Sequence, residues 1–115
     1  MIMEFTFDKD KVEEAGYTME SIYSAMKDNF KKNGLRCIDS GEVLTFGGTG
    51  TKDDYGKMLI MMGVLSSQGW FMYTVSSWVF RKKDSREDVL KHFRDGIAKG
   101  DYDYQWIRSA KAANY

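Results

Sequence analysis

The sequence has one cysteine, one histidine and no proline in 115 residues, and it contains no low-complexity tract or internal repeat. A lone thiol cannot close an intramolecular disulfide or build a thiolate zinc site, so Cys37 favours a reducing, intracellular setting. No Ser-His-Asp arrangement can be assembled around His92, which we expect on a helix. These shortages exclude a disulfide scaffold and leave few candidate residues for chemistry.

The sequence also lacks a charge excess, a long apolar run and a secretory signal. Lys plus Arg and Asp plus Glu both number 17, so no global field steers the chain toward nucleic acid or an anionic membrane, although a local patch could still bind RNA. No apolar run approaches the roughly 18 residues that a bilayer span needs, and no basic segment followed by an apolar one opens the chain. We expect a cytoplasmic, soluble protein without a membrane partner.

The residues that are present predict one packed domain. An apolar fraction of 43% and an aromatic fraction of 15% are ordinary for a globular chain of this length. Alternation predicts strands over 1–7, 35–39, 42–46 and 70–80. Capping residues and helical spacing predict helices that begin at Thr18, at Thr51 or Asp53, and at Ser85, with a short helix near Asp103.

This order of elements, β-α-β-β-α-β followed by helices, is typical of a ferredoxin-like α+β sandwich. Residues 1–83 form the ferredoxin-like core, and residues 84–115 form a C-terminal helical extension of the same domain. Apolar side chains occupy both faces of the predicted strand 70–80, so something must cover the second face. We expect a homodimer, and the alternative is that the third helix covers the sheet.

Residues 45–56, TFGGTGTKDDYG, resemble a glycine-rich phosphate loop that runs into a helix. A P-loop needs G-x-x-x-x-G-K-[ST], whereas here Lys52 stands one position late after Gly50. Asp53 and Asp54 would repel a phosphate from the helix N-terminus, where carboxylates act as caps. We therefore predict a strand-to-helix connection without a nucleotide.

Two carboxylates follow the first strand, in the segment FTFDKD. If Phe5 and Phe7 face the helices, Asp8 points to the open face of the sheet, and in an extended chain Asp10 lies on the same side. Such a pair could hold Mg²⁺ through Asp8, or act as a general base. An aspartate after a strand is also a common turn or helix-capping residue, so both interpretations stay open.

Two further groups of residues have both a functional and a structural interpretation. The last strand ends in a basic cluster formed by Arg81, Lys82 and Lys83. These side chains could contact RNA phosphates, and a solvated strand end is the simpler interpretation. The aromatic residues between 102 and 106 could stack on bases, but packing against the sheet is the use that we favour.

The landmarks FDKD, SIYSAMKDNFKKNGL, GEVLTFGG and WF occur in this order along residues 3–84. Together they resemble the virulence-associated protein D family, which shares its fold with the small nucleases of CRISPR adaptation. The resemblance implies a ferredoxin-like homodimer that acts as an endoribonuclease, often as the toxin of a toxin–antitoxin pair. It also implies that the first-strand aspartate, Asp8, is central to activity and lies near the two-fold axis, with Asp10 as its neighbour.

The family pattern continues after WF into an Asp-Ile-Arg-like segment, where this chain has SSWVF. Ser77 and Val79 therefore stand where the acid and the arginine would be. One function that follows is RNA cleavage, in which Asp8 binds Mg²⁺ or activates the nucleophile, Asp10 assists, and residues 81–83 hold phosphate. The alternative is a non-catalytic dimeric module, such as an antitoxin, an immunity protein or a phage-type nuclease inhibitor, that binds a cognate protein partner.

Overall fold

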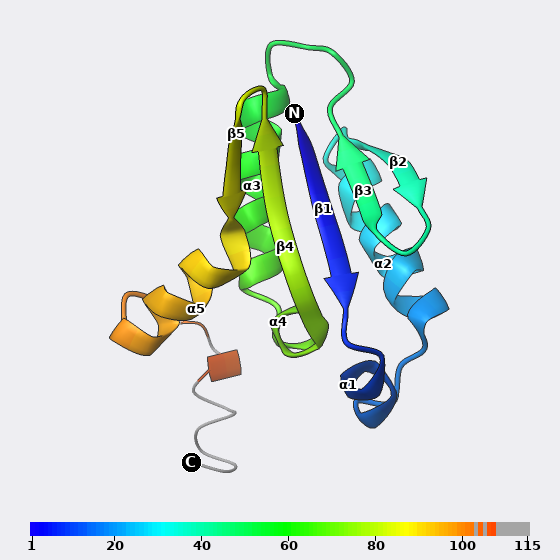
Figure 1. Cartoon of the computed structure of the whole chain (residues 1–115), viewed down its shortest axis with the longest axis vertical. Coiled ribbons are helices and arrows are strands. Elements are labelled where there is room, and N and C mark those ends of the chain that lie inside the picture. Colours follow the sequence, from blue (N-terminus) through cyan, green and yellow to red (C-terminus); the bar gives the residue numbers. More distant parts are fainter. Residues whose placement is uncertain (103, 105, 108–115) are drawn as a thin grey trace.

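A computed structural model of the chain describes residues 1–102, 104, 106 and 107 and confirms the α+β class. The elements in chain order are β1 (Ile2–Phe7), α1 (Lys9–Glu14), α2 (Met19–Lys32), β2 (Arg36–Ser40), β3 (Leu44–Gly47), α3 (Asp54–Ser66), α4 (Gly69–Thr74), β4 (Val75–Lys82), β5 (Ser85–Asp88) and α5 (Val89–Lys99). The strands form one sheet in the order β2-β3-β1-β4-β5, and all neighbours are antiparallel. Figure 1 shows α2 and α3 on one face of this sheet.

Strand β1 alternates between the two faces of the sheet as predicted. Met3, Phe5 and Phe7 are buried toward the helices. The side chains of Glu4 and Thr6 are only partly buried and lie on the opposite side, which we call the open face. This alternation fixes which residues of the neighbouring strands share each face.

Phe5 lies at the centre of the core. Its ring centroid is 5.8 Å from that of Phe30 on α2, 6.0 Å from Phe46 on β3, 5.8 Å from Phe71 on α4 and 5.9 Å from Trp78 on β4. Most of these contacts are edge-to-face, a geometry that aromatic pairs prefer. One side chain therefore connects the central strand to both neighbouring strands and to two helices.

Helix α2 forms where the sequence predicts it. The Thr18 hydroxyl accepts a hydrogen bond from the Ser21 N–H, and the Ser21 hydroxyl accepts one from the Thr18 N–H, so the two residues form a capping box. Ile22, Met26 and Phe30 are buried on one face of the helix. Capping and hydrophobic spacing together explain why this prediction is confirmed.

The predicted strand over residues 70–80 is wrong in its first half, because Gly69–Thr74 is helix α4 and only Val75–Lys82 is strand β4. The Thr74 hydroxyl donates to the Trp70 carbonyl at 2.7 Å, a contact within a helical turn. The helical turn buries both Phe71 and Met72 in the core, and this burial outweighs the strand preference of the segment. The apolar second face that favoured a dimer is therefore smaller than predicted.

The predicted start of the third helix at Ser85 is also wrong, because residues 85–88 form β5. Lys83 has a φ of 46° in the turn between β4 and β5, and this turn folds the chain back along the sheet edge. Helix α5 begins after Asp88, whose carboxylate accepts the Lys91 N–H, and ends at Gly100 as predicted. The short helix expected near Asp103 falls largely on residues outside the described part.

Helix α3 exists as predicted, and the spacing of its apolar residues places one stripe toward the core, formed by Tyr55, Met58, Leu59, Met62 and Leu65. Met58, Met61, Met62 and Leu65 are buried. Tyr55 and Leu59, which the spacing places inward, are 41% and 46% exposed. A helix that is apolar on most sides carries little information about which side faces the core.

We predict that Phe5→Ala lowers the free energy of unfolding by about 3–5 kcal/mol, since it removes a fully buried ring and leaves a cavity. Urea denaturation followed by circular dichroism measures this change. The matched control is Ile60→Ala, because Ile60 is 58% exposed and its truncation should change stability by less than about 0.5 kcal/mol. Equal losses in the two variants would contradict the central position of Phe5.

Candidate functional site

Asp8 lies directly after β1 and is the N-cap of α1. Its backbone N–H donates to the Thr74 carbonyl at 2.8 Å. One carboxylate oxygen, Oδ1, accepts the N–H groups of Asp10 at 3.0 Å and of Lys11 at 3.2 Å. Within the part of the chain that the structure describes, Oδ2 has no hydrogen-bond partner. Asp8 therefore has a capping role and keeps one free oxygen.

The expectation that Asp10 lies on the same side of an extended chain as Asp8 is wrong. Asp10 is exposed in the first turn of α1, where successive side chains rotate by about 100° per residue. Its backbone N–H holds Oδ1 of Asp8, so Asp10 contacts the other carboxylate through its main chain. The two carboxylates do not form a side-by-side pair.

The basic cluster at 81–83 lies at the opposite end of the sheet from Asp8. Ile2 pairs with Arg81 and Phe7 pairs with Val75, so the cluster and Asp8 are separated by roughly 20 Å along β1. Arg81 forms an ion pair with Glu4 on the open face. The ammonium of Lys82 lies 4.3 Å from the centroid of the Tyr55 ring. Within one chain, the structure does not bring these cations to Asp8.

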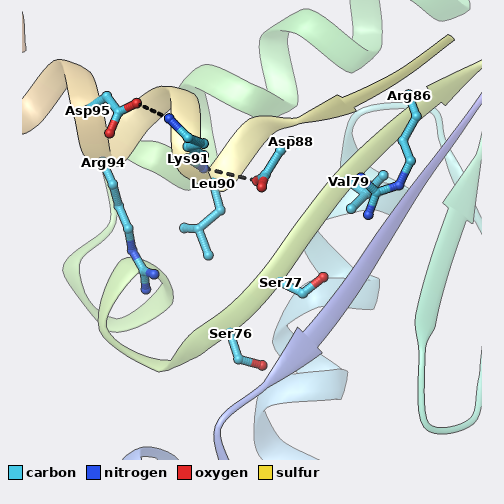
Figure 2. A pocket seen from close by; sticks show the side chains of 9 residues that line it. All are labelled: Ser76, Ser77, Val79, Arg86, Asp88, Leu90, Lys91, Arg94 and Asp95. Carbon is cyan, nitrogen blue, oxygen red and sulfur yellow. Dashed lines mark hydrogen bonds and ion pairs between the residues drawn. The ribbon is translucent and has the colours of Figure 1, made fainter.

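A different set of cations lies on the open face, in a groove of about 330 Å³ between β4, β5 and α5 (Figure 2). We call it the open-face groove. Its lining residues are Ser76, Ser77, Val79, Arg86, Asp88, Leu90, Lys91, Arg94 and Asp95. The Ser76 end lies close to the end of β1, since the Ser76 and Thr6 hydroxyls are 2.8 Å apart. Asp8 follows two residues after Thr6, so the groove ends near Asp8.

Some of the charges in the groove neutralise one another. The Lys91 ammonium donates to the Asp95 carboxylate at 2.7 Å, and this hydrogen bond raises the pKa of Lys91 and lowers that of Asp95. Arg94 donates to the Val75 carbonyl at 3.2 Å. Among the described residues, Arg86 has no hydrogen-bond or ion-pair partner. The groove therefore presents an available guanidinium at one end and serine hydroxyls at the other.

The glycine loop before α3 surrounds a carboxylate of the protein itself, that of Asp54. The Asp54 carboxylate accepts the N–H of Thr49 at 3.2 Å, the N–H of Gly50 at 2.9 Å and the Thr51 hydroxyl at 3.1 Å. A side chain at Gly48 would overlap this carboxylate. Asp54 thus occupies the place that a phosphate would need, as expected of a strand-to-helix connection.

Burial of Asp54 acts to raise the pKa of its carboxyl, but the opposing interactions prevail. The hydrogen bonds from Thr49, Gly50 and Thr51 and the charge of Lys57 together hold the pKa of Asp54 below its ordinary value of 3.8. The ionised carboxylate is therefore the form that this loop favours.

In the ranges 1–102, 104, 106 and 107, no three or more His, Cys, Asp or Glu side chains gather as a metal ion would need. None of the helices in these ranges is long and apolar enough to cross a membrane.

A scan against protein-family models, a search of curated proteins and a search of solved structures each found no match.

The sequence did not predict the open-face groove. The helix expected to begin at Ser85 would include Arg86, whereas residues 81–88 form a hairpin whose two turn residues are Lys83 and Asp84. Such turns are usually signalled by Asn-Gly or Asp-Gly, and this segment has neither. Recognising the hairpin would have placed Arg86 and Asp88 on one face of the sheet.

We predict that Asp54→Asn destabilises the fold in a pH-dependent manner. The folded-state pKa of Asp54 lies below the ordinary 3.8, so its stabilising effect is complete above that value and is lost as the pH falls through the folded pKa. Melting temperatures measured from pH 2.5 to 7 should therefore differ between wild type and variant near neutrality and converge in acid.

The matched control for Asp54→Asn is Asp53→Asn. Asp53 precedes the same helix and makes no side-chain capping hydrogen bond, so its substitution should change the melting temperature little. A difference between wild type and Asp54→Asn that persists unchanged to the lowest pH would contradict the account of the loop.

Proposed function

We propose that this chain is a ferredoxin-like endoribonuclease related to the virulence-associated protein D family. The observation that carries the proposal is the position of the first-strand aspartate, Asp8, near the Ser76 end of the open-face groove. Arginine and serine side chains in such a groove suit the phosphates of a single RNA strand. A carboxylate at the end of the groove suits cleavage of that strand.

The arrangement of the sheet supports the fold part of the proposal. Strands β4, β1, β3 and β2 are consecutive in the sheet, α2 connects β1 to β2, and α3 with α4 connects β3 to β4. Two split β-α-β units give this arrangement in a ferredoxin-like sandwich. Strand β5 then extends the sheet at the β4 edge (Figure 1).

Strand β5 offers the two charges that β4 lacks relative to the family pattern. Ser77 and Val79 stand where the resemblance implies an acid and an arginine, and both line the groove. Asp88 pairs directly with Val79, and Arg86 is the diagonal neighbour of Val79. Side chains at such positions lie about 5 and 7–8 Å apart across a sheet. An acid and an arginine on β5 therefore face the same groove (Figure 2).

The chemistry that we assign to Asp8 is proton transfer. The 2′-oxygen of the RNA forms a bond to phosphorus while the bond from phosphorus to the 5′-oxygen breaks. Oδ2 of Asp8 accepts the 2′ proton, water protonates the departing 5′-oxygen, and a 2′,3′-cyclic phosphate remains. The Asp10 N–H assists by holding Oδ1, which keeps Oδ2 available.

Mg²⁺ is the alternative that Asp8 leaves open. This ion is usually held by one or two carboxylates, with waters and substrate phosphates as its other ligands. Oδ2 of Asp8 fits that requirement, since Oδ1 alone caps α1. When bound, Mg²⁺ would supply charge neutralisation at the phosphodiester.

A homodimer completes the proposal. Gly47 has no side chain, and Ile38 lies over it beside Ile2 on the open face. Ile38 is 50% exposed, so Ile2 and Ile38 form a small apolar patch that a second copy of the chain could cover. The open-face groove lies on β4 and β5, outside this patch.

A single RNA strand is the substrate to test, with variants that separate chemistry from folding. Asn and Ser are good N-caps, so Asp8→Asn and Asp8→Ser should fold like wild type but should cleave labelled single-stranded RNA at least about 100-fold more slowly. Asp8→Ala should lose the same activity and about 1 kcal/mol of stability. Asp28→Asn, on the exposed side of α2, is the control and should keep full activity.

The assay is run with Mg²⁺ and with a chelator, because proton transfer by Asp8 alone survives chelation whereas a metal-dependent site does not. Cleavage that persists in Asp8→Asn and Asp8→Ser would refute the proposed role of Asp8. Absence of cleavage by the wild-type protein would refute the proposed endoribonuclease activity.

One observation favours a second function, a non-catalytic module that binds a cognate protein. The carboxylate of Asp8 already caps α1, so the residue has a structural role without any chemistry. Leu59 and Ile60 on α3 are 46% and 58% exposed and offer an apolar surface to a partner. An inactive wild-type protein that binds a neighbouring gene product would fit this module, as an antitoxin, immunity protein or nuclease inhibitor.

A further inference from the structure

A second cavity, of about 480 Å³, lies between α3, α5, Tyr102 and Tyr104. Strand β5 separates it from the open-face groove. Val79 pairs with Asp88 and Arg81 with Arg86 on the open face, whereas Glu87 pairs with Phe80, which is buried on the other face. The side chains of β5 therefore serve two sites, one on each side of the sheet edge. We call the second one the edge pocket.

The walls of the edge pocket are aromatic and aliphatic. They include Tyr55, Leu59, Phe93, Tyr102 and Tyr104. Tyr102 is fixed by a 3.1 Å hydrogen bond between its hydroxyl and Nε2 of His92, and Tyr104 by a 2.9 Å hydrogen bond between its hydroxyl and that of Ser66. The rings are thus held in place before any ligand binds, which favours recognition of a flat molecule.

Among the residues that the structure describes, Glu87 is the one carboxylate that lines the edge pocket, and none of these lining residues is Lys or Arg. Within the described residues, Glu87 has no hydrogen-bond or ion-pair partner. An ionised carboxylate can only accept hydrogen bonds, and its two oxygens can accept a pair of adjacent N–H donors. The pocket therefore suits a planar ligand that presents two donors on one edge.

The ammonium group of Lys82 lies close to the edge pocket, because it contacts the ring of Tyr55, which lines the pocket. The Lys82 ammonium is 4.3 Å from the centroid of the Tyr55 ring. An anionic group on a ligand could reach this ammonium while a ring occupies the pocket. The charges thus complement a molecule with a donor edge and an anionic end.

We propose that the edge pocket binds a guanine nucleotide, either free or as one unit of an RNA strand. Guanine presents adjacent N1–H and N2–H donors, which can pair with the two oxygens of Glu87. The base lies against the tyrosine rings, and the phosphate contacts Lys82. Adenine, cytosine and uracil lack this pair of adjacent donors, so Glu87 selects against them. This binding goes beyond the proposed cleavage and does not require it.

The test is a calorimetric titration of the full chain with guanosine monophosphate, adenosine monophosphate and inorganic phosphate. Guanosine monophosphate should bind at least about tenfold more tightly than either competitor, as a bidentate contact to a base edge implies. Glu87→Gln should weaken this binding about tenfold, and Tyr55→Ala should weaken it further, because that change removes both a wall and the ring below Lys82.

Glu20→Gln is the matched control, since it removes an exposed carboxylate from α2, far along the chain from the pocket, and should leave binding unchanged. Equal affinity for the two nucleotides, or unchanged binding in Glu87→Gln, would overturn the proposal. So would the absence of binding at millimolar concentration.

Two short RNAs, one with a single guanine and one with uracil only, distinguish the source of the ligand. Preferential binding of the guanine-containing RNA assigns the pocket to an RNA unit, and binding of the mononucleotide alone assigns it to a free nucleotide. The Asp8 variants are expected to bind guanosine monophosphate like wild type. The failure of the cleavage proposal and the failure of this one can therefore be told apart.

Discussion

The ring of Phe5 is the contact on which the rest of the structure depends. It lies on the central strand and meets rings from β3, β4, α2 and α4, all at centroid distances of about 6 Å or less. Because Phe5 faces the helices, Glu4 and Thr6 must face the open side. The same alternation sets Thr6 against Ser76 and brings the chain to Asp8 at the end of β1. The position of the candidate site is thus a consequence of how one aromatic side chain packs.

The sequence predicts the elements whose local signals agree with their packing. Strand β1 alternates cleanly, and α2 has both a capping box and a single buried stripe, so local preference and tertiary contacts give the same answer. Residues 69–74 show the opposite case. Their aromatic and β-branched side chains favour a strand, but a helical turn buries Phe71 and Met72 more completely. Local preference cannot reveal such a competition, because the winning contacts come from distant residues.

The candidate site was harder to predict, because it depends on a hairpin. The aspartates and the basic cluster are visible in the sequence, but the register of β1 and β4 places them at opposite ends of the sheet. The groove whose Ser76 end approaches Asp8 is instead lined by residues of β4, β5 and α5. Arg86 joins this groove only because the chain turns at Lys83, and its pairing with Arg81 places it at the end of the groove away from Asp8. The capping interpretation of Asp8 and the non-phosphate interpretation of the glycine loop, in contrast, follow from local chemistry and agree with the geometry.

The central claim is that RNA phosphates bind in the open-face groove, and the salt dependence of binding tests it most directly. Each cation that contacts a phosphate on a single strand contributes about 0.7 to the slope of log affinity against log salt. For binding of a short single-stranded RNA, Arg86→Gln should therefore reduce the slope by about 0.7, and Lys31→Gln, at the exposed end of α2, should leave it unchanged. Equal slopes for wild type and Arg86→Gln would contradict the account.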